Sequence, residues 1–464
     1  MQTKKISSQN ATTILNILST VILQGLAFIS SPYFSRTLGT ANFGIVSVYT
    51  TWVQVVSIVF GLRINGVLIM GQNEYPEEKQ KGFQSSIMFL SIVTYAFFSL
   101  VTIGITGILL QSNFQMVLLI LLHGFGQCCV SFANSKFTNE FKADANFMLS
   151  VLMSVSTIIL SVILIRNTPS PINYWGRIYG EAIPYLIVGV IITAFVLARG
   201  KIFIDIAYWK FSIPLAVPMV FHTLAGIVLN QSDRVMLQSM TTDSVVGIYS
   251  LAYTFSNVLF VCWSALNNSW VPFFYEYMRR NQLALMKKKA MNYTELFCVV
   301  TCGFMLLTPE VYHIFASEDY WSGTSMIPLL AIGTFFVFLY SFPVNYEIFY
   351  KKTKMIAYAS VFGAGCNILL NYFLIKIAGG YGAAIATLLS YILQFILHHI
   401  NAEKISRKNE DYPFKITEFL PYVLIITAIC LLCTFSVPGV IRWIMALSAG
   451  AFEVYRMARR KSIF

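Results

Sequence analysis

The sequence has few charged residues. Only 11% of its 464 residues are Asp, Glu, Lys or Arg, whereas soluble globular proteins average about 25%. A soluble chain of this length would form several domains of about 100–200 residues each, and so few charges cannot cover their surfaces. The composition therefore excludes a soluble enzyme, a secreted disulfide scaffold and a disordered protein.

Motifs for nucleotide and metal chemistry are missing as well. No G-x-x-x-x-G-K-[ST] stretch is present to hold the phosphates of ATP. No H-E-x-x-H motif occurs, and the adjacent His398 and His399 cannot share one helix face as metal ligands usually do. We therefore expect neither cofactor nor metal, and we do not expect an enzyme.

Hydrophobic residues make up 57% of the chain, and its mean hydropathy is +0.68. Fourteen apolar stretches reach or approach the length of about 20 residues that a helix needs to cross a bilayer. They are residues 12–35, 43–70, 84–110, 114–135, 147–165, 178–198, 211–230, 244–271, 292–316, 325–349, 355–375, 381–401, 418–436 and 439–456. Such continuous runs favour helices over the alternating strands of a membrane barrel. The predicted fold class is an all-α integral membrane protein with about 14 transmembrane helices.

The segments between these spans alternate in positive charge. With a cytoplasmic N-terminus, 25 of the 32 Lys and Arg residues fall on the inside, six on the outside and one, Arg63, inside a span. The six outside cations are Arg36, Arg166, Arg177, Arg234, Lys376 and Arg442. This asymmetry predicts that both termini are cytoplasmic. It also explains the net charge of +12 by topology and attraction to membrane lipids, so we expect no nucleic-acid partner.

Two short matches indicate an internal repeat. Residues 43–45 (FGI) resemble residues 246–248 (VGI), and residues 179–183 (YGEAI) resemble residues 381–385 (YGAAI). The two offsets differ by a single residue, and the matches join the second span to the eighth and the sixth to the twelfth.

The repeat predicts two parallel six-helix lobes around a central cleft, the geometry of an alternating-access transporter. The N-lobe would take residues 1–200 and the C-lobe residues 201–403. Residues 404–464 would add a C-terminal helix pair and a cytoplasmic end.

Ionisable residues inside spans are costly and are therefore candidates for function. Arg63 lies beside Asn65 in a glycine-flanked stretch of the second span. It is a candidate ligand in the cleft, or its side chain extends to the lipid headgroups. Arg36, at the outer end of the first span, is either a second cleft ligand or a headgroup anchor.

Further candidates lie in other spans. Asp233 and Arg234 end the seventh span and form either part of the binding site or a local ion pair. His123 and His222 are candidates for proton coupling, or they are hydrogen-bonded packing residues. Glu347 is a third candidate for coupling, or it pairs with the lysines that follow it.

The sign of these charges favours an anionic substrate. Glu140 and Glu181 are placed only at span ends, so the first six helices carry essentially no deep carboxylate to hold a cation. The candidate cleft charges are mostly Arg, whose forked donors suit phosphate.

Three stretches carry a resemblance to a known family. Residues 31–39 (SPYFSRTLG), 42–45 (NFGI) and 61–63 (GLR) resemble the amino-terminal signature of Wzx-type polysaccharide flippases. These flippases belong to the multidrug/oligosaccharidyl-lipid/polysaccharide exporter superfamily, whose fourteen-helix plan is similar to that predicted for the whole chain.

The resemblance implies transport of an undecaprenyl-pyrophosphate-linked oligosaccharide from the inner to the outer leaflet of a bacterial plasma membrane. Arg36 and Arg63 match the positions at which related lipid II flippases direct arginines toward the pyrophosphate. The implied partners are this substrate, membrane lipids and a polysaccharide polymerase.

Two other functions remain open. One is a cation-coupled drug or metabolite exporter of the same superfamily, which would depend on a carboxylate such as Asp233 or Glu347. The other is a membrane-embedded glycosyltransferase or polymerase. The short predicted outer loops and the lack of a clustered acid/base set disfavour it.

Overall fold

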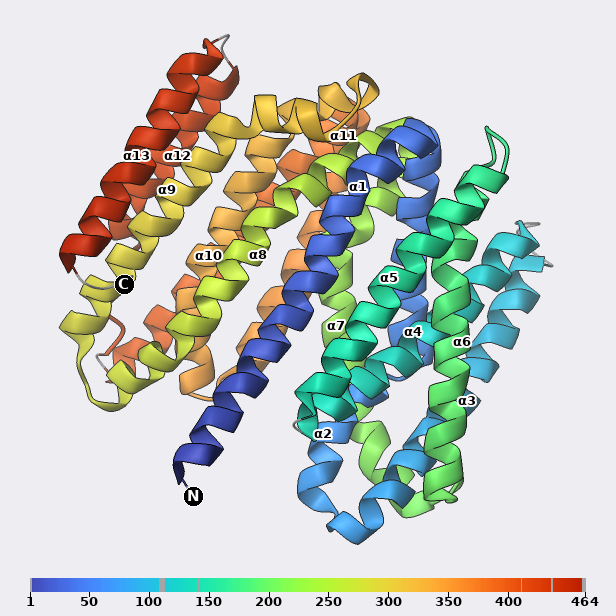
Figure 1. Ribbon diagram of the computed structural model, residues 1–464. Coiled ribbons are helices and arrows are strands. Elements are labelled where there is room, and N and C mark those ends of the chain that lie inside the picture. The colour runs from blue at the N-terminus through green and yellow to red at the C-terminus, as the bar shows by residue number, and fades with distance from the viewer. Residues whose placement is uncertain (1, 108–112, 141, 410, 435–436, 461–464) are drawn as a thin grey trace. The chain divides into compact units, whose positions relative to one another are not determined.

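The computed structural model describes residues 2–107, 113–140, 142–409, 411–434 and 437–460 (Figure 1). This part of the chain consists of helices joined by turns and short loops. The helices are α1 (Gln2–Phe60), α2 (Ile64–Glu74), α3 (Glu77–Ile105), α4 (Phe114–Asn139), α5 (Ala143–Asn167), α6 (Tyr174–Gly200), α7 (Ile206–Met240), α8 (Asp243–Arg279), α9 (Leu283–Phe315), the 3₁₀ helix η2 (Glu318–Ser325), α10 (Ile327–Phe349), α11 (Thr353–Asn409), α12 (Ile416–Thr434) and α13 (Gly439–Arg460).

Eleven of the described helices are long and apolar enough to cross a membrane. Helices satisfy their own backbone hydrogen bonds, which is what a chain in hydrocarbon requires. The protein is therefore an all-α, multi-pass membrane protein, and the predicted fold class is confirmed. The predicted spans 84–110 and 418–436 end at residues outside the described ranges.

Two pairs of predicted spans are continuous helices with a bend in place of a loop. The first span and the larger part of the second lie on α1, which bends at Gly39. Gly39 has φ 73° and ψ 173°, a conformation that costs a glycine little because it has no Cβ. Likewise, α11 contains both the eleventh and the twelfth span and breaks at Ala378 and Gly379. One or two residues suffice to redirect each helix, so the residues that were expected to form loops stay helical.

Two further helices differ from their predicted spans. The second span was predicted to reach residue 70, but α1 ends at Phe60 and a turn separates it from the short α2. Helix α13 is too charged to count among the eleven apolar helices. Its cations instead pair with α9: Arg442 pairs with Glu310, and Arg460 Nη2 lies 2.8 Å from Glu295 Oε2. Figure 1 shows α12 and α13 beside α9, and both helices contact it.

The described chain forms two compact units, Met1–Ile227 and Val228–Phe464, with α7 contributing to both. In the first unit α1, α4, α5 and α6 pack against one another, and α3 packs on α6. In the second unit an aromatic core around Trp270, Tyr293, Phe338 and Phe342 joins α8, α9 and α10. The lobes predicted from the repeat, divided at residue 200, remain a prediction.

Helices α5 and α6 approach closely at Gly180. A Cβ on Gly180 would collide with the backbone and Oγ of Ser161 on α5. This close approach also sets the distance between α5 and the polar side chains at the start of α6.

Replacing Gly180 by Val should destabilise the first unit, because α5 and α6 would be forced apart. We expect the free energy of unfolding to fall by about 1–3 kcal/mol, measured by thermal unfolding of the purified protein in detergent. Gly303, in α9, has open space where its Cβ would lie, so Gly303→Val is the matched control. Equal melting temperatures for Gly180→Val and the unaltered protein would contradict the close packing.

Candidate functional site

Arg63 lies in the turn between α1 and α2. Leu62 and Arg63 both have left-handed backbone conformations, with φ of 52° and 44°. Each such conformation costs a residue with a side chain about 1–3 kcal/mol, and strained residues of this kind cluster at functional sites. Arg63 was predicted to lie inside a helical span, but it occupies this strained turn because α1 ends at Phe60.

Hydroxyl groups of α3 stabilise the end of α1 at this turn. Ser91 Oγ donates to the carbonyl of Gly61 at 3.1 Å, and Thr94 Oγ1 donates to the carbonyl of Phe60 at 2.9 Å. The last carbonyls of a helix lack intrahelical partners; here the Gly61 carbonyl also accepts from the Ile64 N–H at 3.4 Å, and the two hydroxyls add to this bonding. The turn that presents Arg63 is thus fixed by side chains about 30 residues later in the sequence.

Arg63 and Asn65 line one cavity of about 170 Å³. Its lining residues are Gln54, Ser57, Ile58, Arg63, Asn65, Gln127, Cys128, Ser131 and Ile227, from α1, α2, α4, α7 and the turn before α2. Among these described residues Arg63 carries the only formal charge, and the polar groups around it are amides and hydroxyls. An arginine with neutral hydrogen-bonding neighbours can accept an anion without losing an existing ion pair.

A second cavity of about 350 Å³ lies among α1, α4, α5 and α6. It shares Gln54 and Gln127 with the Arg63 cavity, so the two are adjacent. The remaining lining residues are Ser30, Thr50, Val53, His123, Met153, Ser154, Thr157, Ile158, Arg177, Glu181 and Tyr185. In the first unit, Gln54 and Gln127 thus stand between the cavity of Arg63 and the cavity of Arg177.

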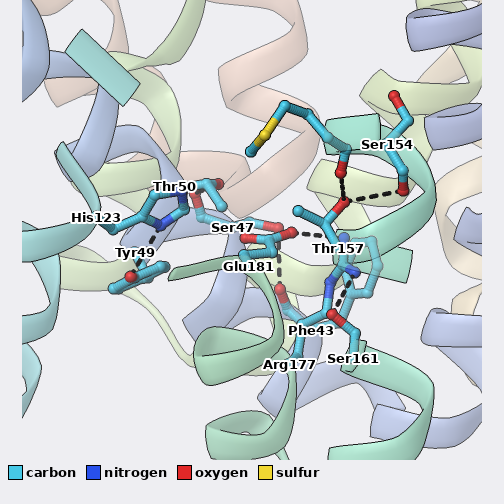
Figure 2. Close-up of polar contacts among 11 residues, drawn as sticks. Phe43, Ser47, Tyr49, Thr50, His123, Ser154, Thr157, Ser161, Arg177 and Glu181 are labelled. Carbon is cyan, nitrogen blue, oxygen red and sulfur yellow. Dashed lines mark hydrogen bonds and ion pairs between the residues drawn. The ribbon is translucent and has the colours of Figure 1, made fainter. Parts of the chain in front are cut away.

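Arg177 is tied into the protein by three contacts. Its Nη2 lies 2.5 Å from Glu181 Oε1, and its Nη1 donates to Ser161 Oγ at 3.0 Å. The guanidinium also lies 3.8 Å above the ring of Phe34. Figure 2 shows Arg177 and Glu181 of α6 together with Ser161 and Thr157 of α5. With side chains only 17% and 13% exposed, the pair is largely buried and mutually neutralised.

His123 is buried in the same cavity. Its Nδ1 is hydrogen-bonded to the hydroxyl of Tyr49 at 3.0 Å, as Figure 2 shows, and its ring packs against Tyr185. His222, in contrast, has an exposed side chain on α7. Arg36 is also exposed, on α1 just before the Gly39 bend, and lines neither cavity.

Asp233 and Arg234 lie in the second unit, buried in α7, which extends past them to Met240. The backbone N–H of Arg234 donates to Asp233 Oδ1 at 2.8 Å, and the hydroxyl of Tyr249 donates to Oδ2. The Arg234 guanidinium lies 4.6 Å from the ring centre of Tyr253. These two residues thus belong to a hydrogen-bonded and aromatic network within the second unit.

Glu347 pairs with a histidine, not with the lysines that follow it. Its Oε2 lies 2.9 Å from Nδ1 of His398 on α11, and both side chains are at most 2% exposed. The other carboxylate oxygen, Oε1, has no hydrogen-bond partner among the described residues. The ring of Tyr340 packs beside His398. Glu347 and His398 thus form a buried acid–base pair.

Sequence patterns missed part of this site. Arg177 was assigned to an outside loop and Glu181 to a span end, yet both lie in the first two turns of α6. Their spacing of four residues was the available signal, because residues at i and i+4 meet on one helix face. Gln54 and Gln127 gave a weaker signal, as uncharged polar residues within apolar spans.

The family model described as "Polysaccharide biosynthesis protein" matches residues 10–278. The chain belongs to this family. One relative, protein 1 of the Lsg locus of Haemophilus influenzae, is 21% identical over 359 residues, which cover 72% of this chain and 83% of the relative. The predicted resemblance to polysaccharide flippases is confirmed at the level of the family.

Solved structures share the fold of this polysaccharide biosynthesis protein. The lipid II flippase MurJ in an inward closed conformation aligns with a TM-score of 0.73 and 15% identity, covering 96% of this chain and 99% of that one. An inward-facing multidrug resistance MATE family transporter of the MOP superfamily aligns with a TM-score of 0.60 and 12% identity, covering 85% and 99%. The fold is therefore that of flippases and exporters.

Replacing Arg177 by Ala should destabilise the protein, because Glu181 would keep a buried charge without its partner. We expect the free energy of unfolding to fall by about 3 kcal/mol, and the double variant Arg177→Ala/Glu181→Ala to regain part of that loss. Thermal unfolding in detergent measures both.

Arg280 and Glu276 provide the control, because this pair has the same four-residue separation but side chains 65% and 45% exposed. Arg280→Ala should cost less than about 1 kcal/mol. If the two Arg→Ala variants lose equal stability, burial of the Arg177 pair does not determine its contribution.

Proposed function

We propose that this protein is a flippase that moves undecaprenyl-pyrophosphate-linked oligosaccharide units from the inner to the outer leaflet by alternating access. Membership of the polysaccharide biosynthesis family and a fold shared with a lipid II flippase support this proposal. In this proposal the protein lies in the bacterial plasma membrane with both termini in the cytoplasm. A polysaccharide polymerase would take up the delivered units.

The observation that carries the proposal is the Arg63 cavity. Arg63 is held in a strained turn, beside a cavity whose other described polar lining groups are amides, hydroxyls and a thiol. Arg177, by comparison, already has Glu181 as its counter-ion. Of the two arginines that line these cavities, Arg63 is therefore the one that can take a diphosphate as its counter-ion.

The other proposed substrate contacts have different support. Asn65 lines the same cavity as Arg63 and donates to Ser135 Oγ at 3.5 Å. Arg36 would meet the headgroup near the outer end of its passage. Arg234 and Asp233 are further proposed substrate contacts, with the Tyr253 ring beside Arg234 as a face for a sugar.

Substituting Arg63 by Ala should strongly reduce flipping, because the diphosphate would lose a charge-assisted, two-pronged contact. In vesicles carrying a lipid-diphosphate oligosaccharide, we expect the rate of leaflet exchange to fall on the order of tenfold to a hundredfold. Arg63→Lys should give an intermediate rate, because Lys keeps the charge but loses the forked geometry.

The control is Arg166→Ala, which removes an exposed cation at the end of α5. It should flip the substrate at the unaltered rate. Unchanged flipping by Arg63→Ala, in protein that inserts normally, would remove Arg63 from the proposed site.

We propose Glu347 as the group that couples transport to a proton gradient, through its pair with His398. Tyr340 packs on His398, while Glu403 and Tyr412 contact the neighbouring His399 and not the pair itself. Tyr412 lies outside the spans, where burial and the Glu403 and Glu347 carboxylates raise its pKa, so its hydroxyl stays protonated. His123, already bonded to Tyr49, and the exposed His222 are the weaker coupling candidates.

Glu347→Gln should uncouple transport from the proton gradient, because an amide cannot exchange a proton at this position. We expect an imposed pH gradient to accelerate flipping in the unaltered protein but not in the variant, as measured in the same vesicles. Glu403→Gln is the control, since Glu403 is 54% exposed and bonds to His399. A full gradient response in Glu347→Gln would exclude this role.

A cation-coupled exporter of drugs or metabolites is the second candidate function. The buried carboxylate of Asp233 and the shared MATE fold favour it. The pairing of Glu181 with Arg177 disfavours it, because that carboxylate of the first unit is already neutralised. Resistance to cationic compounds upon expression, lost in Asp233→Asn, would support the exporter over the flippase.

A further inference from the structure

The first unit contains a third cavity, of about 710 Å³, at the ends of several helices. It lies among the end of α2, the start of α3, the end of α4, the start of α5 and the end of α6. Its lining residues are Gln72, Tyr75, Glu77, Gln80, Lys81, Gln84, Lys136, Phe137, Asn139, Glu140, Lys142, Phe195, Val196 and Arg199. None of these residues lines the Arg63 cavity or the second cavity, which contains Arg177 and His123.

Four cations from different elements crowd this cavity. The Lys136 side chain is only 16% exposed, and Lys142, Arg199 and Lys81 are all close enough to act on its charge. Glu140 offsets part of this repulsion, with contacts of 3.9 Å to Lys136 and 2.6 Å to Lys142. Even with Glu77 counted, four positive charges face two negative ones. Like charges held together in a partly buried site favour the binding of an anion.

Two lining residues have buried amide atoms without a hydrogen-bond partner. Asn139 Nδ2 is a buried donor without a hydrogen-bond partner, and it suits a phosphate oxygen. Gln80 uses its Nε2 to cap α2 at the Gly71 carbonyl, 3.0 Å away, which leaves its buried Oε1 without a donor. A hydroxyl group on the ligand would supply that donor.

One side of the cavity continues onto an apolar helix face. Phe195 lines the cavity and is 50% exposed, and the Arg199 guanidinium lies 4.3 Å from its ring centre. Ile191, one turn earlier on α6, is 61% exposed. A ligand whose phosphate reaches Arg199 can therefore lay an acyl chain along Phe195 and Ile191.

We propose that this cavity binds a glycerol phosphate group, either as the headgroup of an anionic phospholipid such as phosphatidylglycerol or as free glycerol phosphate. Lys136, Lys142, Arg199 and Lys81 neutralise the phosphate, and Asn139 donates to it. Gln80 accepts a hydrogen bond from a glycerol hydroxyl. The site is separate from the proposed substrate site and does not depend on which lipid-linked sugar is moved.

The test measures binding to the full chain, purified in neutral detergent, of phosphatidylglycerol, phosphatidylcholine and glycerol 3-phosphate. We expect native mass spectrometry to show retention of phosphatidylglycerol over phosphatidylcholine. The pair Lys142→Gln/Arg199→Gln should weaken that retention about tenfold, because two charge-assisted contacts are lost. The matched pair Lys352→Gln/Lys354→Gln removes two exposed cations from the second unit and should leave it unchanged.

Glycerol 3-phosphate distinguishes the two sources of the phosphate. If glycerol 3-phosphate raises the melting temperature of the protein and displaces the lipid, the glycerol phosphate group alone is sufficient for binding. If only the lipid binds, the acyl chains are required. The charge-preserving pair Lys142→Arg/Arg199→Lys should retain binding, which separates loss of charge from loss of folding. Equal retention of the two lipids with no effect of glycerol 3-phosphate would overturn the proposal, as would equal losses in the two Gln pairs.

Discussion

The absence of hydrogen-bonding solvent inside a bilayer constrains the rest of this structure. Each backbone N–H and C=O in hydrocarbon needs a partner within the protein, so the described chain is built from helices. Where α1 stops, Ser91 and Thr94 of α3 supply partners to the carbonyls of Gly61 and Phe60. A non-helical turn can therefore exist at this point, and it gives Arg63 its position beside a cavity.

The same constraint applies to charged side chains. Arg177 is buried with Glu181 and Ser161, and Glu347 with His398, because an isolated charge in such places would be too costly. In α13, cations that lower its hydropathy are paired with carboxylates of α9. The position of a charged residue in these helices thus depends more on a side chain that can pair with it than on local hydropathy.

Hydropathy predicted the fold class because it depends on local composition, which a sequence shows directly, whereas the orientation predicted from charge asymmetry stays a prediction. The bends at Gly39 and Gly379 were not predicted, since the same residues could equally form a short loop. The pairing of Glu347 with His398 joins residues 51 positions apart, and no local pattern encodes such a contact. Arg63 was identified because a lone arginine in an apolar run is conspicuous, although its strained backbone was not foreseeable.

The buried cations of this chain differ in how their charge is balanced. This difference distinguishes cations that stabilise the fold from cations that are proposed to bind a ligand. Arg177 has a carboxylate, so binding an anion there would require breaking an existing pair. Arg234 contacts amide and carbonyl oxygens and an aromatic face, and the buried carboxylate of Asp233 is close enough to balance its charge. The Arg63 cavity offers described partners that are neutral, and the cavity around Lys136 has more cations than carboxylates. Positive charge left unbalanced beside open space is where an anionic ligand gains most from binding, and the two proposed sites follow from that rule.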